Sequence, residues 1–394
     1  MAVNLKSKPF YLSDEDIKWV NDTIADMTIE EKIGQLFIHY NETGNLTHFL
    51  NELDQYHTGA ARLDVDSAKK TYEDYKVIQQ NSKIPYLIPF NGDQGGNGVC
   101  SEGTVIASSA ACGATSDTET AYNVGFVAGR EAAAVGINWD FGPCVDLLFN
   151  WRNTIINTRA YGNDVDKVIE NSKAYIKGLR ESNVAACAKH FPGDGVEELD
   201  QHLVTGINSL SSEEWDNSFG KVYKALIDDG LQSIMIGHIA LPEYSRKLRP
   251  GIKDAEIMPA SLAAELLQDL LRDQLGFNGL IVTDASHMAG MTSAMPRKDQ
   301  VPGAIAAGCD IFLYFNKPHE DYSYMMEGYE NGIITEERLH DALSRILGLK
   351  AALKLHERSF PGEGGLSVIG CEEHLEMAKI AADKSITLVK DTEQ

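Results

Sequence analysis

The feature that constrains the fold most is a regular alternation of short apolar runs with segments of helical length. Eight runs are rich in β-branched and aromatic residues, as buried strands are. Eight strands alternating with helices predict an α/β protein of the (β/α)8 TIM-barrel class rather than a doubly wound sheet. The predicted strands are residues 36–40, 59–63, 86–90, 137–141, 184–188, 233–237, 280–283 and 310–315.

Two segments between these runs carry clear helix signals. Residues 28–35 begin with Thr28 and Glu31 in a Thr-x-x-Glu capping box, which satisfies free N–H groups of a first helical turn. Residues 261–275 carry apolar side chains at helical spacing, which predicts one face packed on the sheet.

The C-terminal part of the chain has a different pattern. Residues 336–354 predict a long amphipathic helix, residues 360–370 a Gly- and Pro-bearing linker, residues 374–383 another helix, and residues 386–389 a short strand. We therefore expect a single catalytic barrel domain over residues 1–355. Residues 356–394 are expected to form a short extension that consists of a linker and a helix/strand remnant.

The charge of the chain excludes several classes of partner. Its 394 residues include 35 Lys and Arg against 58 Asp and Glu, a net charge of -23. Nucleic acids and anionic membranes need a basic surface, so neither is expected as a partner.

The six cysteines form no Cys-x-x-Cys pair, and no run of 18 apolar residues occurs. These patterns predict no disulfide framework, no thiolate zinc site, no leader and no membrane span, and hence a cytoplasmic protein.

Titratable side chains follow most of the predicted strands. In a TIM-type barrel, functional groups stand where strands end and the following loops begin. The residues at these places are Asp93, Arg159, Lys189, His190, His238 and Asp284.

The densest signal is the segment from Lys189 to His202. A buried strand ends on Lys189 and His190, and a Gly/Pro loop leads to Asp200-Gln201-His202. In a functional interpretation His202 transfers protons, and Asp200 fixes its tautomer and raises its basicity. The alternative is a solvated acidic loop with turn residues.

Two carboxylates allow two interpretations each. Asp284 ends an apolar strand, where it is either a nucleophile or metal ligand at the barrel mouth or a cap of the next helix. Asp93 lies in Asn-Gly-Asp-Gln-Gly-Gly and is similarly ambiguous, and these glycines match neither a dinucleotide nor a P-loop fingerprint.

With these residues the sequence resembles a known family. Lys-His-Phe-Pro-Gly-x-Gly, with Asp-x-His beginning eleven residues after the Lys, is similar to the signature of the β-N-acetylglucosaminidase branch of glycoside hydrolase family 3, whose members include suspected phosphorylases. The resemblance covers residues 25–350. Further segments that agree in order and spacing are residues 27–36, 92–94, 158–162 and 276–285.

The resemblance implies a role for each matching residue. Asp284 stands at the position of the catalytic nucleophile, His202 at that of the acid/base, and Asp200 at that of its dyad partner. The implied substrate-binding residues are Asp93, Arg159, Lys189 and His190, which mix donors and acceptors as a sugar ring requires. Further candidates for lining the site are His238, Asp194 and His287.

An imidazole acid/base has a consequence for the second substrate. A carboxylate would repel an anion by about 4 kcal/mol at 4 Å and an effective dielectric near 20, whereas histidine removes that barrier. We therefore expect a retaining β-glycoside phosphorylase with phosphate as co-substrate, no cofactor and no metal, with hydrolysis as the alternative. Asp194 and Gln201 depart from the branch pattern, so β-glucosides are expected as substrates besides β-N-acetylglucosaminides.

Two rival interpretations remain open at this point. A metal-dependent barrel hydrolase is suggested by four residues on consecutive strand ends, His190, His238, Lys189 and Asp284, although the first strand offers only His39 as a further ligand. A non-catalytic sugar-binding protein would have the same pocket without turnover. The sequence predicts a monomer or homodimer without choosing between them.

Overall fold

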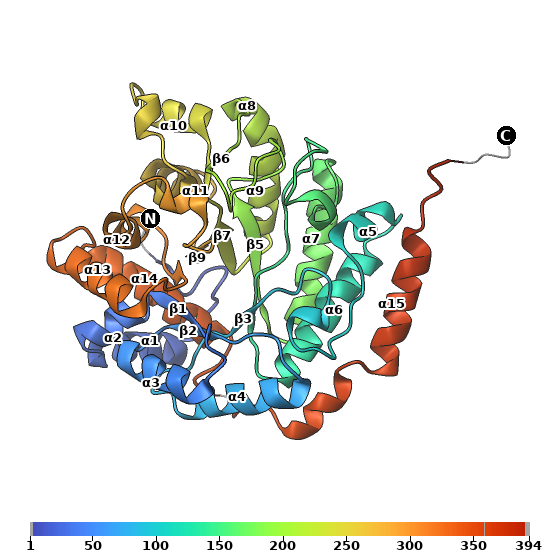
Figure 1. Cartoon of the computed structure of the whole chain (residues 1–394), viewed down its shortest axis with the longest axis horizontal. Coiled ribbons are helices and arrows are strands. Elements are labelled where there is room, and N and C mark those ends of the chain that lie inside the picture. Colours follow the sequence, from blue (N-terminus) through green and yellow to red (C-terminus); the bar gives the residue numbers. More distant parts are fainter. Residues whose placement is uncertain (1–2, 358, 391–394) are drawn as a thin grey trace.

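The computed structural model describes residues 3–357 and 359–390. Eight parallel strands occupy its centre, one at each predicted run (Figure 1). One sheet has the order β10 (Phe312–Leu313), β1 (Phe37–Tyr40) and β2 (Ala60–Arg62). The other has the order β3 (Pro89–Phe90), β4 (Trp139–Asp140), β5 (Ala185–Phe191), β7 (Ser233–Ile236) and β9 (Leu280–Thr283).

Isolated bridges connect the two sheets at both edges. Ala60 pairs with Leu87 in parallel, and Val282 pairs with Ile311 in the same sense. Each of the eight strands is followed by helical segments, and β10 is followed by α13 and α14, so the chain has a TIM-type β/α arrangement. All residues of β5, β7 and β9 are buried, as expected for strands covered on both faces.

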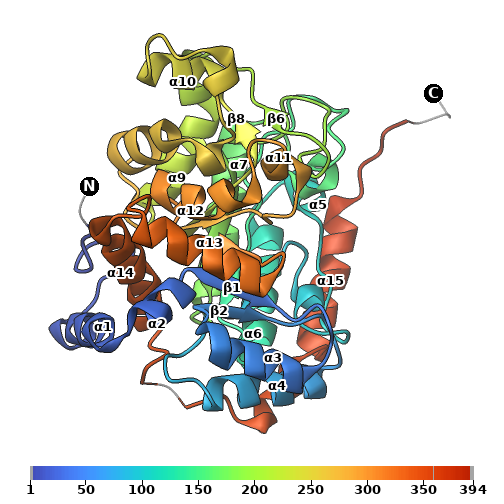
Figure 2. The ribbon, with the colours of Figure 1, turned by 60° about the vertical axis from the view of Figure 1, so that its left-hand side comes forward.

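Helices surround the strands on the outside (Figures 1 and 2). The helices of the N-terminal half are α1 (Asp14–Asp26), α2 (Ile29–Gly34), α3 (Leu46–Tyr56), α4 (Ala68–Gln80), α5 (Ser109–Ala114), α6 (Glu119–Ala134) and α7 (Val165–Arg180). Those that follow are α8 (Ser212–Trp215), α9 (Lys221–Asp228), α10 (Pro242–Leu248), α11 (Ala289–Thr292), α12 (Arg297–Ala307), α13 (Pro318–Glu330) and α14 (Glu336–Ala352).

The helix signals of the sequence had two outcomes. The capping box is confirmed, because the Thr28 hydroxyl accepts the Glu31 N–H while Glu31 accepts the Thr28 N–H. Residues 261–275 do not form one regular α-helix: a 3-10 turn η5 (Ala260–Leu262) leads into a π-helix η6 (Glu265–Gln274). Apolar spacing predicted a helix there but does not determine its hydrogen-bond pattern.

The pair β6 (Gly206–Ile207) and β8 (Ile239–Ala240) was not predicted. Each strand has two residues, which is too short for a recognisable period. The pair matters because it connects the loop after β5 to the end of β7.

The prediction of a strand at residues 386–389 is wrong. After a 3-10 turn η7 (Glu363–Val368) and helix α15 (Glu372–Ser385), the chain runs on without regular structure to residue 390. Ile386, Leu388 and Val389 are 79%, 78% and 92% exposed, and a strand needs a neighbour to bond its backbone groups. Helix α15 itself is held by the His374 Nδ1 to Glu131 Oε1 contact of 2.7 Å.

Among the described residues, no helix combines the length and the apolar character that crossing a membrane requires.

Candidate active site

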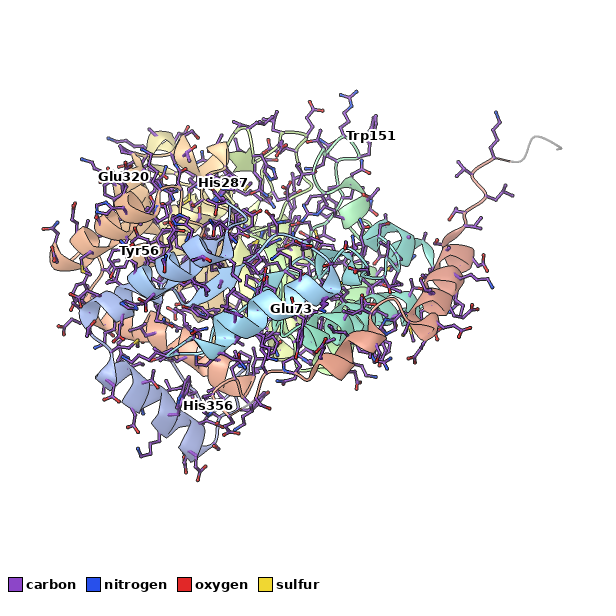
Figure 3. The ribbon with its side chains drawn as sticks, turned by 60° about the horizontal axis from the view of Figure 1, so that its bottom comes forward. Tyr56, Glu73, Trp151, His287, Glu320 and His356 are labelled. Atoms are coloured by element: carbon purple, nitrogen blue, oxygen red, sulfur yellow. The ribbon has the colours of Figure 1, made fainter. Side chains whose placement is uncertain are left out.

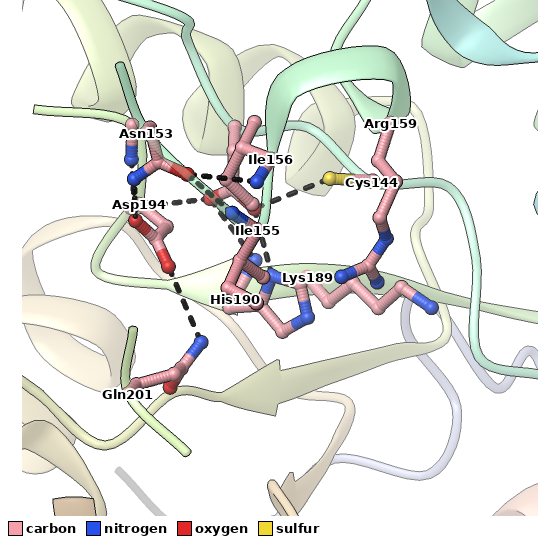
Figure 4. Close-up of polar contacts among 12 residues, drawn as sticks. Cys144, Asn153, Ile155, Ile156, Arg159, Lys189, His190, Asp194 and Gln201 are labelled. Carbon is pink, nitrogen blue, oxygen red and sulfur yellow. Dashed lines mark hydrogen bonds and ion pairs between the residues drawn. The ribbon is translucent and has the colours of Figure 1, made fainter. Parts of the chain in front are cut away.

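The candidate residues gather where the parallel strands end: Lys189 and His190 lie in the last part of β5, and the others lie on loops that follow β3, β4, β5, β7 and β9. Figure 4 shows Arg159, Lys189, His190 and Asp194 among them. Two cations share one carboxylate there. Lys189 Nζ lies 3.1 Å from Asp93 Oδ1, and an Arg159 guanidinium nitrogen lies 3.8 Å from Asp93 Oδ2. Burial favours a higher pKa for Asp93, but Lys189 and Arg159 outweigh it and hold the pKa below its usual range. The group therefore carries one positive charge in excess.

Asp93 is supported from behind by a buried carboxyl group, Asp140 in β4. Asp140 accepts the Gly92 N–H at 2.7 Å and the Tyr175 hydroxyl at 2.6 Å. Its burial raises its pKa to about 7. Asp140 thus fixes the turn that presents Asp93, a role that its position inside a strand gave no reason to expect.

His190 is oriented by Asp146, which the sequence analysis missed. The His190 Nδ1 lies 2.7 Å from Asp146 Oδ2, and both side chains are buried. Asp146 also accepts the backbone N–H groups of His190 and Asp194. The available signal was a carboxylate a few residues after the fourth strand, in Pro-Cys-Val-Asp, but it lies too far past the strand end to be singled out.

Asp284 follows β9 directly, as predicted. Its backbone N–H donates to the Ile236 carbonyl at 2.8 Å, and its Oδ1 accepts the Ala285 N–H at 2.7 Å. Burial favours a higher pKa, but His190, the Ala285 N–H and Lys189 outweigh it, so the pKa lies below the usual carboxyl value. An ionised carboxylate at this place is suited to act as a nucleophile.

His238 lies beneath this carboxylate with both ring nitrogens engaged. Nε2–H donates to the Ala285 carbonyl at 3.0 Å, so Nδ1 accepts from the Ser261 hydroxyl at 2.9 Å. Burial lowers the pKa of His238, which keeps the ring neutral. His238 therefore positions the loop that carries Asp284, and its nitrogens are not free to bind a metal, which the rival metal-dependent mechanism requires.

The predicted dyad forms. His202 Nδ1 lies 2.7 Å from Asp200 Oδ1, and Asp200 also accepts the His202 backbone N–H at 2.8 Å. The carboxylate fixes the Nδ1–H tautomer, so Nε2 is the nitrogen that exchanges a proton. The His202 side chain is 53% exposed.

The dyad loop contacts the segment that follows Asp284. The Ala289 N–H donates to the His202 carbonyl, and the Gly290 N–H donates to the Gln201 carbonyl, each at 3.0 Å. Thr205 Oγ1 donates to the Gly290 carbonyl at 2.9 Å. The structure thus brings His202 and Asp284, which are 82 positions apart in the sequence, onto adjoining loops.

Asp194 lies inside the loops (Figure 4). It is buried, and its oxygens accept from the Asn153 amide at 2.8 Å, the Gly195 N–H at 2.6 Å and the Gln201 amide at 3.3 Å. Burial and the charge of Asp146 raise its pKa. Its protein contacts point to support of the loops rather than to a contact with sugar.

His287, in contrast, is exposed (Figure 3).

A second pair that the sequence analysis missed lies across the strand ends: Arg62, at the end of β2, donates to the Tyr314 hydroxyl at 2.8 Å. Both line a cavity of about 260 Å³. Arg62 was inside a predicted strand, so nothing marked it as a site residue.

Among the residues that the structure describes, one group of potential metal ligands lies at the site. The ligand atoms of Cys144, Asp146 and His190 are all within 4.8 Å of one another and buried. They contact each other, since the Cys144 thiol donates to Asp146 at 3.2 Å and Asp146 holds His190. Burial, together with the charge of Asp146, raises the pKa of Cys144 well above its usual value, which disfavours the thiolate that binds metals.

Comparison with known proteins gives one consistent family. The family model for the glycosyl hydrolase family 3 N-terminal domain matches residues 28–349 of this chain. A β-N-acetylglucosaminidase/β-glucosidase from Cellulomonas fimi is 44% identical over 391 residues, which are 99% of this chain and 69% of that protein. A β-hexosaminidase from Hydrogenovibrio crunogenus is 31% identical over 56% of this chain and 59% of that protein.

Solved structures agree with these sequence matches. A β-glucoside phosphorylase, BglX, superimposes with a TM-score of 0.95 and 42% identity over 98% of this chain and 70% of that one. A family 3 β-N-acetylglucosaminidase from Paenibacillus sp. gives a TM-score of 0.83 and 25% identity over 92% of this chain and 70% of that one.

Proposed function

This chain belongs to glycoside hydrolase family 3, and we propose that it is a retaining β-glycoside phosphorylase acting on β-glucosides and β-N-acetylglucosaminides. The observation that carries the proposal is the His202–Asp200 pair, 2.7 Å apart, on a loop bonded to the segment after Asp284. A carboxylate and a proton-transferring imidazole on adjoining loops are the two groups that a double displacement at an anomeric carbon needs.

In the first step, a carboxylate oxygen of Asp284 attacks the anomeric carbon. The bond from that carbon to the aglycone oxygen breaks, and protonated His202 gives its Nε2 proton to the leaving oxygen. A glycosyl ester of Asp284 and a neutral imidazole result. The lowered pKa of Asp284 keeps the attacking group ionised.

In the second step, a phosphate oxygen attacks the anomeric carbon and the ester bond to Asp284 breaks. The products are a sugar 1-phosphate of retained configuration and the free carboxylate, and the proton of the attacking hydrogen phosphate returns to Nε2 of His202. An anionic nucleophile needs no base, and a neutral imidazole does not repel it as a carboxylate would. The excess positive charge of Lys189 and Arg159 beside Asp93 supports binding of a dianion inside an acidic protein.

The relatives support both sugar types. The Cellulomonas fimi protein carries both activities in its name, and the BglX structures are of a β-glucoside phosphorylase. The second candidate function is hydrolysis, in which water replaces phosphate and His202 acts as its general base. The names of the curated relatives favour this candidate.

The test compares products in buffers with and without phosphate. With aryl β-glucoside and aryl β-N-acetylglucosaminide, we expect phosphate to raise the rate and sugar 1-phosphate to be the main product. Free sugar at an unchanged rate would assign the enzyme to hydrolysis instead.

We further propose that the eight strands close into one (β/α)8 barrel and that residues 1–355 form the catalytic domain. We place the enzyme in the cytoplasm, which the six free cysteines support. Its partners are then a small carbohydrate and phosphate, with no cofactor.

A further inference from the structure

The loop that carries the dyad is anchored through the residue between its two members. Leu199 and Leu203 are 50% and 77% exposed, and the His202 side chain is half exposed. Gln201 is only 1% exposed. Its side chain is thus buried in the protein, whereas Leu199, His202 and Leu203 beside it are exposed.

Both polar atoms of the Gln201 amide have partners. Oε1 accepts the backbone N–H of His238 at 2.9 Å, and Nε2 donates to Asp194 Oδ2 at 3.3 Å (Figure 4). The amide cannot be reversed, because its oxygen would then face a carboxylate and its NH2 group would face an N–H donor. One buried side chain therefore joins the dyad loop to the ends of β5 and β7.

The connection continues to the proposed nucleophile. His238, whose N–H binds Gln201, donates from Nε2 to the carbonyl of Ala285, the residue after Asp284. The Gln201 carbonyl in turn accepts the Gly290 N–H beyond it. The backbone N–H of Asp284 itself is held separately, by the Ile236 carbonyl at 2.8 Å. We therefore expect a change at Gln201 to act more strongly on His202 than on Asp284.

We propose that Gln201 is the positioning residue of the His202–Asp200 dyad, and that the Asp194 carboxylate fixes the orientation of its amide. The proposal rests on the proposed function, in which His202 protonates the leaving group. Gln201 and Asp194 both depart from the related sequence pattern, and in this proposal they position the dyad together.

The contacts of Asp194 allow a reciprocal exchange as the test. Its Oδ1 accepts from Asn153 and Gly195, so in Asp194→Asn the amide NH2 must face the NH2 of Gln201. Gln201→Glu instead opposes two carboxylates. In the double variant, the new amide at position 194 donates to the new carboxylate at position 201, which still accepts the His238 N–H. Each single change breaks the anchor, and the pair restores it.

The readout separates positioning from general damage. Each single variant should lower kcat/KM on phenyl β-glucoside, a poor leaving group, by about 100-fold, because general acid catalysis contributes on this order. On 2,4-dinitrophenyl β-glucoside, which leaves without protonation, the loss should be under about fivefold. The double variant should recover both values. Equal losses on both substrates, or no recovery, would overturn the proposal.

Two controls keep the inference independent of turnover. Glu198→Gln removes a charge from the same loop at a side chain that is 54% exposed, and it should change kcat/KM on neither substrate. Hydrogen exchange of residues 199–204 should be faster in each single variant and normal in the double variant. Unchanged hydrogen exchange in the single variants would overturn the inference. A wild-type protein without any turnover would instead contradict the proposed function, and the exchange result alone would then show whether Gln201 anchors the loop.

Discussion

Lys189 Nζ lies 3.1 Å from Asp93 Oδ1, although Lys189 lies in β5 and Asp93 follows β3, and the lysine side chain is only 2% exposed. A buried ammonium group of this kind is tolerated because it is paired. Removing it leaves Asp93 with Arg159, whose nearest nitrogen is 3.8 Å away.

Lys189→Met should therefore shift the pH dependence of the reaction. Lys189 is first among the charges that lower the pKa of Asp93, so its loss raises that pKa and the acidic limb of kcat/KM moves to higher pH. The effect on stability has the matching sign. In the wild type, the Lys189–Asp93 pair stabilises the folded protein fully above the unfolded carboxyl pKa of about 3.9, and this stabilisation is lost as the pH falls through the lower pKa of Asp93 in the folded protein. A pH–rate profile measures the first effect; Lys167→Met, at an exposed position, is the control.

Asp284→Ala should abolish turnover of every β-glycoside, because it removes the carboxylate that we propose forms the covalent intermediate. We expect a loss of at least about 1,000-fold, with partial recovery in azide, which fits the space left by the carboxylate and attacks directly. Formation of α-glycosyl azide, identified by NMR, distinguishes this from misfolding. Normal activity in Asp284→Ala would remove the residue from the mechanism.

The strand positions were the part of the fold that the sequence predicted best. Each run is apolar because both of its faces are covered, so burial itself makes it visible, and Asp284 and Lys189 could be placed from the strand ends alone. The Thr28 capping box was similarly local, since both of its partners lie within four residues.

Contacts between distant segments were not predictable. Asp146 holds His190 from 44 positions away, and Arg62 meets Tyr314 across 252 positions. No periodicity encodes such pairs, which arise only when the strand ends meet. Gln201 was noticed as a departure from a sequence pattern, but its buried amide contacts could not be inferred from residue type.

His202→Ala should affect substrates according to their leaving groups. Loss of the proton donor should reduce kcat/KM for phenyl β-glucoside by about 100- to 10,000-fold and leave 2,4-dinitrophenyl β-glucoside nearly unaffected. His340→Ala, at an exposed histidine of α14, serves as the control. Equal losses on both substrates would exclude an acid role.

The last prediction concerns Lys350, a fully buried lysine of α14 remote in sequence from the proposed catalytic residues. Its Nζ donates to Gln35 Oε1 at 2.7 Å, and burial lowers its pKa to about 7. The unfolded chain, with a lysine pKa near 10.4, binds the proton more tightly than the folded chain does. Stability should therefore rise with pH between about 7 and 10. Urea unfolding in this range measures the slope, which Lys350→Met should remove and Lys379→Met, at a 71% exposed side chain, should keep. An equal slope in wild type and Lys350→Met would mean that Lys350 stays charged in the folded protein.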